Sequence, residues 1–516
     1  MYKNQSGFTP IQIILSILVG VVVLGGIVGG VLYYSKQSNQ QVQQGSCGDG
    51  VCGPAEKADL NLCPQDCEGQ TVAPSAQAPS PTGQQPTNTE QINWDSPFGI
   101  FGPYETLSAQ NPLKSVSKTD INSILKDIGV WVEEMPRGDN INEISKSGAN
   151  IYSRIMCTGK TPPYTSDQKC KDSIRSTINQ YKDTIKYWEF GTEPNGLTPP
   201  TGWKGYAKEY ATDLKEAYTI VKEECPDCYV VFGGLGGVGV GATEMPGGAA
   251  DFLKDALSAG AGSYFDVFEF KQHSANASDY KEIVTKLNIY SKIFSDNGVN
   301  INNKLIFIET ATHDGSPNPK YNYSPGLKSQ TQAQQATGLL KYYIYSISQG
   351  IDKIFWNLVY ERHNFGSTGA TRPDAPSIPE GSSVFDYYGL INNPDNDGDS
   401  SKKLAYYTYK KMVEVLDGSD WNNIQTIQEK DGIYIYKFTK NNKPIWVAWN
   451  DNSGSKQATI SSITSNQVKV TESIPKYESG KEVTDYSTAF NTETKTVSGG
   501  KVTITLKDIP VFVEGN

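Results

Sequence analysis

The chain has 516 residues, with 46 Lys and Arg against 56 Asp and Glu and a formal net charge of −10. This length predicts more than one domain, and an aromatic fraction of 11% excludes a mainly disordered chain. An acidic chain without long basic runs excludes nucleic acid as an expected partner, and three His and eight Cys leave little room for a multi-metal enzyme.

The amino terminus predicts a membrane anchor. After a tail of residues 1–10, residues 11–34 carry no charge and read IQIILSILVGVVVLGGIVGGVLYY. At about 1.5 Å per residue this segment is long enough to span a hydrocarbon core of about 30 Å, and it exceeds the apolar region of a cleavable signal peptide. The stretch from Ser6 to Leu18 also resembles the start of type IV prepilins, with Gln12 where that pattern has Glu. This resemblance to prepilins leaves a cleaved, pilin-like surface component as an alternative to the membrane anchor.

Residues 46–68 form a cysteine-rich segment. Cys47, Cys52, Cys63 and Cys67 lie in the run CGDGVCGPAEKADLNLCPQDC, whose spacings differ from the usual C-x2-C pairs of a zinc site. Zinc stays an alternative, but the run resembles the small CGDGxC…CPxDC modules of secreted proteins, which implies two disulfides. The other four cysteines complete an even count, typical of an oxidising exterior. We therefore expect a single-pass cell-membrane protein whose catalytic region is extracellular.

Residues 69–92 consist almost entirely of Pro, Ser, Thr, Gln, Gly and Ala and are expected to be a disordered linker. Beyond the linker, short apolar β-rich runs alternate with amphipathic helical patterns, which predicts a (β/α)8 TIM barrel over residues 93–418. The runs are residues 97–102, 129–132, 149–155, 187–190, 229–232, 265–270, 304–308 and 353–358. Helical patterns cover residues 172–181, 204–224, 249–259, 280–297 and 330–349.

An open doubly wound sheet is the structural alternative to this barrel. It would need a glycine-rich phosphate loop after an early strand, whereas the glycine-rich run 233–241 follows the fifth strand and lacks a phosphate-binding Lys. That run instead predicts a close approach of two backbones.

Two further segments complete the chain. Residues 419–516 read as short alternating strands separated by turn residues, which predicts a small all-β sandwich. The loop Asn393–Ser401 resembles a calcium loop but has Leu404 where an EF-hand needs Glu, so we expect a solvated turn.

Two carboxylates lie at the ends of predicted barrel strands, where the chemistry of such barrels is found. The fourth run continues as W-E-F-G-T-E-P-N and places Glu193 just past the strand. The seventh run ends in L-I-F-I-E-T and places Glu309 at its tip. Glu189, four residues before Glu193, is expected to face the same way but deeper, as a carboxylate of the barrel core.

From about residue 95 onward the chain resembles the clan A glycoside hydrolases of the family 5 and family 39 type. W-E-F-G-T-E-P-N is similar to their acid/base motif, I-F-I-E-T to their nucleophile strand, and I-F-W-N, residues 354–357, to their last strand with its sugar-stacking Trp. The resemblance implies a membrane-anchored retaining glycosidase that cleaves O-glycosidic bonds of oligo- or polysaccharides. Glu193 is then the general acid/base, Glu309 the nucleophile and Trp356 the stacking platform, with the carboxyls about 5–5.5 Å apart.

Other residues near these strand ends are candidates for contacts with the sugar. Thr192 stands where the clan has an Asn that bonds the sugar 2-hydroxyl, which leaves a non-catalytic glycan-binding or adhesion protein as an alternative. His273, His313 and His363 follow the sixth, seventh and eighth predicted strands and are expected to bond sugar hydroxyls. A zinc site and, mostly for His363, a plain surface position are the alternatives. No metal or cofactor is expected. Weaker candidates for the cleft are Arg137, Arg154, Asn195 and Lys271.

Overall fold

The computed structural model describes residues 96–104, 113–136, 138–159, 161–236, 248–318, 327–362, 381–397, 401–476 and 483–515. All of them belong to the second of two compact units, residues 77–516. The predicted tail, membrane segment, cysteine-rich module and linker lie outside the described residues. Within the described ranges, no helix combines the length and the apolar character that crossing a bilayer requires.

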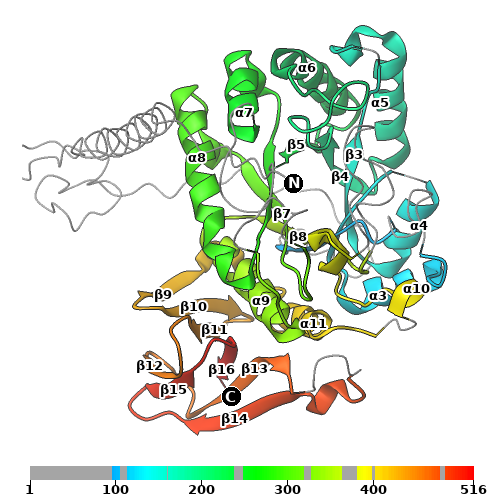
Figure 1. The fold of residues 1–516 in the computed structure, drawn as a ribbon. Coiled ribbons are helices and arrows are strands. Elements are labelled where there is room, and N and C mark those ends of the chain that lie inside the picture. Colours follow the sequence, from blue (N-terminus) through cyan, green and yellow to red (C-terminus); the bar gives the residue numbers. More distant parts are fainter. Residues whose placement is uncertain are drawn as a thin grey trace, which may run out of the picture. The chain divides into compact units, whose positions relative to one another are not determined.

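Eight parallel strands close into a barrel in the order β1 to β8 (Figure 1). Every strand overlaps one of the eight predicted runs, so the expected (β/α)8 fold is confirmed. Closure between β1 and β8 brings Gly99 against Phe355, where a Cβ on Gly99 would lie 2.6 Å from the Phe355 ring. The strands are β1 Phe98–Phe101, β2 Trp131–Glu134, β3 Asn150–Ile155, β4 Ile185–Phe190, β5 Tyr229–Leu235, β6 Val267–His273, β7 Leu305–Ala311 and β8 Lys353–Trp356.

Helices surround the barrel and pack their apolar faces on it (Figure 1). The sequence patterns did not identify α3 and α4, which are rich in polar residues and bury only a few Ile and Leu at helical spacing. The start of α3 is nonetheless well signalled, since Ser117 and Asp120 form a capping box there. The helices are α3 Lys118–Ile128, α4 Gly138–Ser147, α5 Gln168–Tyr181, α6 Ala207–Glu224, α7 Ala249–Ser258, α8 Glu282–Asp296, α9 Gln332–Ser348, α10 Pro394–Asp397 and α11 Leu404–Leu416.

The C-terminal part is antiparallel β structure with a core of its own. A six-stranded sheet has the order β14-β13-β16-β11-β10-β9, and β12 pairs with β15. Two details differ from the sequence expectation: β9 was not predicted, and residues 483–488 form a loop with a short 3-10 turn instead of a strand. The strands are β9 Gln425–Lys430, β10 Ile433–Lys440, β11 Lys443–Asn450, β12 Lys456–Ile460, β13 Gln467–Pro475, β14 Phe490–Thr496, β15 Val502–Leu506 and β16 Val511–Gly515.

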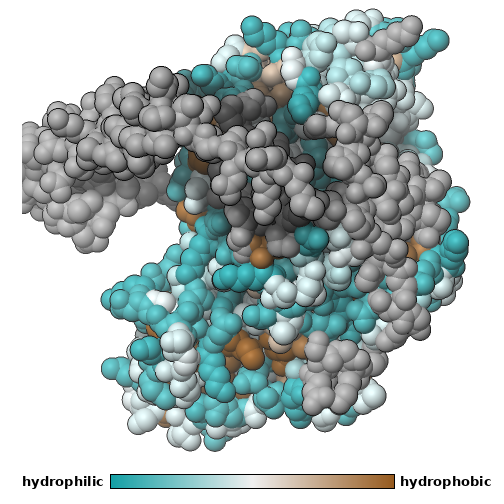
Figure 2. Space-filling model, viewed as in Figure 1, coloured by the Kyte–Doolittle hydropathy of each residue, from teal (hydrophilic) through white to brown (hydrophobic). Residues whose placement is uncertain are grey.

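The sandwich is held against the helical layer of the barrel. Lys341 of α9 forms an ion pair with Asp451 at 3.0 Å, and the Tyr280 hydroxyl donates to the same carboxylate at 2.8 Å. The Trp449 indole N–H in turn donates to Tyr280 at 3.1 Å. The face shown in Figure 2 is largely hydrophilic where its residues are described. Ile427 is the one large hydrophobic residue of the described chain that is clearly exposed.

Two disulfides lie in the barrel. Cys157, just after β3, is bonded to Cys170 at the start of α5, and Cys225 is bonded to Cys228 between α6 and β5. The first bond ties a loop at the C-terminal end of the barrel to the following helix. The second closes the turn that leads from α6 back into the sheet.

Inside the barrel, side chains fill two layers. The hydrophobic layer comprises Trp131, Tyr152, Tyr187, Val231, Val267, Phe307 and Phe355, all buried. Because alternate strand residues share a face, the next inward residue lies two positions further along each strand. On five of the strands those residues form an ionic layer towards the C-terminal ends: Glu133, Arg154, Glu189, Glu269 and Glu309. Lys271, two positions beyond Glu269 on β6, completes this layer.

Candidate active site

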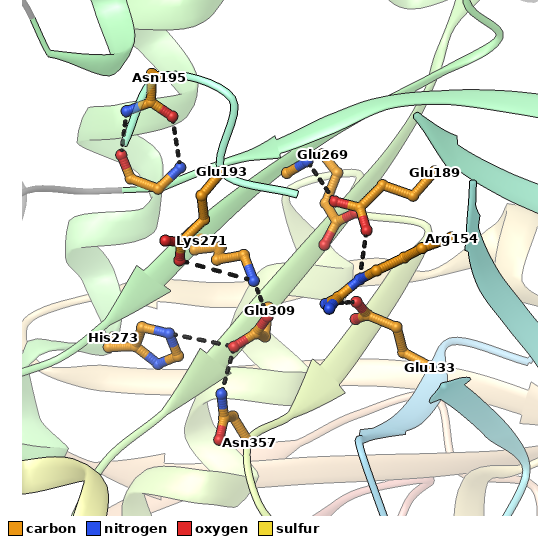
Figure 3. A network of polar contacts seen from close by, with 12 residues as sticks. Glu133, Arg154, Glu189, Glu193, Asn195, Glu269, Lys271, His273, Glu309 and Asn357 are labelled. Carbon is orange, nitrogen blue, oxygen red and sulfur yellow. Dashed lines mark hydrogen bonds and ion pairs between the residues drawn. The ribbon is translucent and has the colours of Figure 1, made fainter. Parts of the chain in front are cut away.

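Glu309 lies at the centre of the ionic layer and is 1% exposed. It stands beside Lys271 of the neighbouring strand in the sheet register, and the Lys271 ammonium forms an ion pair with Oε2 (Figure 3). The other oxygen, Oε1, accepts a hydrogen bond from the Asn357 amide and lies 3.4 Å from Nε2 of His273. Burial alone would raise the pKa of Glu309, but the Lys271 ammonium and the His273 ring outweigh burial and hold it well below its usual range. Glu309 is therefore an ionised carboxylate at neutral pH.

Glu193 faces Glu309 from the loop that follows β4. Its side chain is 40% exposed, and Oε1 lies 3.9 Å from the Lys271 ammonium. Its backbone has φ +43°, in the left-handed region that costs a side-chain-bearing residue energy and that recurs at functional sites. The backbone N–H donates to the Gly234 carbonyl at 3.0 Å and holds this conformation in place.

A single ammonium therefore contacts both carboxyl groups. Because an ion pair spans at most about 4 Å, the two oxygens that Lys271 contacts lie within about 8 Å of each other. The expectation that Glu193 and Glu309 meet at the C-terminal end of the barrel agrees with this geometry. A carboxyl separation within this range suits either a retaining or an inverting glycosidase.

The loop that carries Glu193 is fixed to the end of β5 by glycines and by Asn195. The Asn195 amide donates to the Gly236 carbonyl at 2.7 Å and accepts from the Gly236 N–H at 2.9 Å. A Cβ on Gly233 would lie 2.1 Å from the Gly191 carbonyl, and one on Gly236 would lie 2.9 Å from the Glu193 side chain. The close backbone approach predicted for this glycine run is confirmed. Asn195 therefore holds the loop that carries Glu193, and both its side-chain oxygen and its side-chain nitrogen are already hydrogen-bonded.

Deeper in the barrel than Glu309, Glu133 and Glu189 both contact the second cation of the ionic layer, Arg154. Arg154 forms ion pairs with Glu133 and, at 2.6 Å, with Glu189, which also accepts the Gly234 N–H at 2.8 Å. Glu189 is thus the barrel-core carboxylate that the sequence predicts. Burial, with help from the charges of Glu189 and Glu309, raises the pKa of Glu133 to about 8 although Arg154 opposes the shift. Burial thus shifts Glu133 towards its protonated form.

Burial acts on Glu269 in the same direction. Its pKa is raised well above the usual range, first by burial and then by Glu133 and Glu189, and the Tyr152 hydroxyl donates to its Oε2. Oxygens of Glu133, Glu269 and Glu309 lie within 4.8 Å of one another, a spacing that a cation could bridge. Lys271 and Arg154 already supply positive charge at this point, so we assign no metal to it. The group formed by Cys225, Asp227 and Cys228 offers no thiolate, because both cysteines are in a disulfide.

Two of the predicted sugar contacts need correction. His313 is fully buried, and its ring nitrogens lie 2.8 Å from the Asp314 carbonyl and 3.0 Å from the Ala275 carbonyl. Trp356 is also fully buried, and its indole N–H donates to the Tyr388 carbonyl at 3.0 Å. Trp356 follows Phe355, which faces the barrel interior, so strand alternation turns the indole outward to the helices. Neither residue has surface left for a sugar in this structure.

The remaining candidates have mixed positions. His273 contacts Glu309 and stacks on Tyr388 with ring centres 5.4 Å apart. Thr192 precedes Glu193, and its buried hydroxyl has no hydrogen-bond partner among the described residues. Arg137 and His363 lie outside the described residues. Sequence reasoning did not single out Asn357 or Tyr388, although Asn357 directly follows Trp356 in the I-F-W-N run.

No protein-family model matches the chain, and no curated protein matches it. Solved structures do share its fold. A family 39 glycoside hydrolase from the gut symbiont Bacteroides cellulosilyticus WH2 aligns with a TM-score of 0.51 at 16% identity, over 81% of each chain. A family 51 alpha-L-arabinofuranosidase from Bifidobacterium longum aligns at 0.52 and 13%, over 81% of this chain and 95% of that one. The GH39 enzyme from Xanthomonas axonopodis pv. citri aligns at 0.52 and 9%, over 82% and 95%.

Proposed function

We propose that the chain is a retaining glycoside hydrolase that cleaves O-glycosidic bonds of oligo- or polysaccharides. The observation that carries the proposal is the pair Glu193 and Glu309, which extend from two different strand ends to one ammonium group. One carboxyl is buried and ionised, and the other is partly exposed and braced by its loop. A glycosidase needs such an asymmetric pair, because one carboxylate must attack while the other carboxyl donates a proton.

The proposed reaction has two steps. Glu309 attacks the anomeric carbon as the bond to the leaving oxygen breaks, and Glu193 gives its proton to that oxygen. Glu193, now a carboxylate, then takes a proton from water, which displaces Glu309 and releases the sugar with its original configuration. Asn357 and His273 hold Oε1 of Glu309, so that the attacking carboxylate does not have to be oriented during the reaction.

A panel of polysaccharides and aryl glycosides, assayed for reducing sugar, tests this function on the full chain. On the substrates that respond, proton NMR of the first product anomer should show retention of configuration. The isosteric variant Glu309→Gln should be inactive on the same substrates, with Glu282→Gln, a change on α8, as the matched control. Inversion at the anomeric carbon, or equal activity of Glu309→Gln, would reject the mechanism.

We further propose that the enzyme is anchored in the cell membrane by residues 11–34 and works outside the cell. The disulfides Cys157–Cys170 and Cys225–Cys228 support an oxidising compartment, because cytosolic proteins rarely keep such bonds. Non-reducing mass spectrometry of the native protein should find Cys47, Cys52, Cys63 and Cys67 in two further disulfides. Four free thiols in that segment would argue for a cytosolic domain.

Thr192 favours a second candidate, a glycan-binding protein without turnover. The shorter Thr side chain replaces the amide that the resembling enzymes present beside the acid/base, and its buried hydroxyl has no partner within the described chain. Under this candidate, oligosaccharides bind in calorimetry but no substrate is cleaved. Restoration of turnover by Thr192→Asn would identify a site that lost its activity through this one residue.

A further inference from the structure

Lys271 is the cation that both proposed catalytic carboxylates share. It lies on β6, its side chain is 7% exposed, and its ammonium lies over the Phe101 ring, 5.4 Å from the ring centre. No other lysine or arginine of the described residues forms an ion pair with Glu193 or Glu309. Arg154, the other cation of the ionic layer, is occupied by Glu133 and Glu189.

The proposed reaction moves one negative charge past this ammonium. Before attack, Glu309 is the carboxylate and Glu193 holds a proton. When the bond between Glu309 and the anomeric carbon forms, Glu309 becomes a neutral ester, and Glu193, having given its proton to the leaving oxygen, becomes the carboxylate. The three groups together keep the same net charge, but the negative charge is now on Glu193, 3.9 Å from the ammonium.

We propose that Lys271 is a positioning residue that serves as counter-ion in both steps, to Glu309 in the free enzyme and to Glu193 in the glycosyl-enzyme. The inference rests on the proposed function of the two glutamates. A buried cation between the two sites stabilises either charge distribution with a small movement of one flexible side chain, in a low-dielectric layer where charge pairing is strong. A neutral residue at this position would support neither carboxylate.

The neutral variant Lys271→Met keeps an unbranched side chain and removes the charge. Stopped-flow kinetics with a dinitrophenyl glycoside, whose leaving group needs no proton, separate the burst that forms the intermediate from the steady rate that breaks it down. In Lys271→Met we expect the burst rate to fall about 100-fold and the breakdown rate about 10-fold. Azide should raise the breakdown rate of this variant towards the wild-type value, because it attacks without a general base.

The pH profile gives a readout that a purely structural role would not move. The titratable groups that face Glu309 are Glu269, Lys271 and His273 of β6, Glu133 of β2, Glu193 and Tyr388. Removing the ammonium leaves burial to raise the pKa of Glu309, so the acidic limb of kcat/KM should move to higher pH in Lys271→Met. Lys271→Arg keeps the charge, so its acidic limb should stay near that of the wild type.

Lys353→Met is the matched control. Lys353 is also buried in the barrel, but its ammonium donates to the Ser96 carbonyl at the opposite end of the barrel from Glu309. If Lys271→Met fails to fold by circular dichroism, Lys271→Gln takes its place with the same expectations. Burst and breakdown rates within about twofold of the wild type, with an unmoved acidic limb, would overturn the role of Lys271. A wild type that turns over no glycoside in the panel would instead reject the proposed function itself.

Discussion

The hydrophobic and ionic layers of the barrel interior are built on the same strands and differ in almost every physical property. One step of two residues leads from the first to the second: from Trp131 to Glu133, from Tyr187 to Glu189 and from Phe307 to Glu309. The hydrophobic layer needs only shape and burial to be stable. The ionic layer places four glutamates with two cations in the same low-dielectric interior, so each member depends on its neighbours.

This difference teaches how the fold separates stability from chemistry. The raised pKa values of Glu133 and Glu269 and the ion pairs from Arg154 and Lys271 offset the burial of the four carboxylates. The same arrangement leaves Glu309 ionised and in contact with Asn357. Changes in the hydrophobic layer should therefore act on folding, and changes in the ionic layer on turnover and on pH dependence.

The largest expected effect comes from the centre of the ionic layer. Glu309→Ala removes the group that would form the covalent intermediate, so turnover of every responding glycoside, activated aryl glycosides included, should fall on the order of 10⁴-fold or more. Measured kcat/KM values on natural and aryl substrates check this. A variant that kept aryl glycoside activity would show that the nucleophile is another residue.

In Glu193→Ala, the loss of activity should depend on the leaving group of the substrate. Natural oligosaccharides need a proton from the acid and should lose about 10²- to 10⁴-fold, whereas an activated aryl glycoside should still form the intermediate. Added azide should then yield a glycosyl azide with retained configuration, identified by NMR. If Glu309→Ala were the variant rescued with retention, the roles of the two glutamates would be exchanged.

Phe307→Ala tests the layer below, on the same strand as Glu309. Deleting a fully buried ring should lower the free energy of unfolding by about 3–5 kcal/mol, measured by denaturant titration. Turnover per folded molecule should change far less than in Glu309→Ala. Loss of turnover without loss of stability would mean that the two layers are not separable.

The last effect is a change of stability with pH, and it concerns Glu133. The pKa of Glu133 is about 8 in the folded chain and about 4.5 when unfolded, so between these pH values the folded state holds the extra proton. Stability of the wild type should fall with rising pH across this window, by roughly 1 kcal/mol per pH unit at most. Glu133→Gln should lack this contribution. Unfolding titrations at pH 5, 6.5 and 8 compare the two proteins, and parallel pH dependences would contradict a protonated Glu133.

Much of the barrel could be predicted from the sequence, because parallel strands buried on both faces appear as continuous apolar runs. β9 could not, since QTIQEK is a polar strand at the edge of its sheet, with Ile427 46% exposed. The same apolar runs show where the strands end, so the strand-end positions of Glu193 and Glu309 could also be predicted. The contact of both glutamates with Lys271 could not be predicted, because it depends on the register between β6 and β7.

The errors at Trp356 and His313 have a related cause. A strand end shows which residues lie near the cleft, but a shift of one position decides whether a side chain faces the barrel interior or the helices. Phe355 takes the inward position on β8, so Trp356 turns away from the site. His313 lies two residues beyond β7, where the loop folds its ring against two backbone carbonyls.

Trapping the covalent intermediate identifies the nucleophile directly. The wild-type chain is incubated with activated 2-deoxy-2-fluoro glycosides, which form the intermediate faster than it breaks down, and is then examined by intact-protein and peptide mass spectrometry. We predict the addition of one fluoroglycosyl group per chain, located on Glu309 within the peptide that contains β7. A label on Glu193 or elsewhere, or turnover of the parent glycosides without any label, would contradict the account.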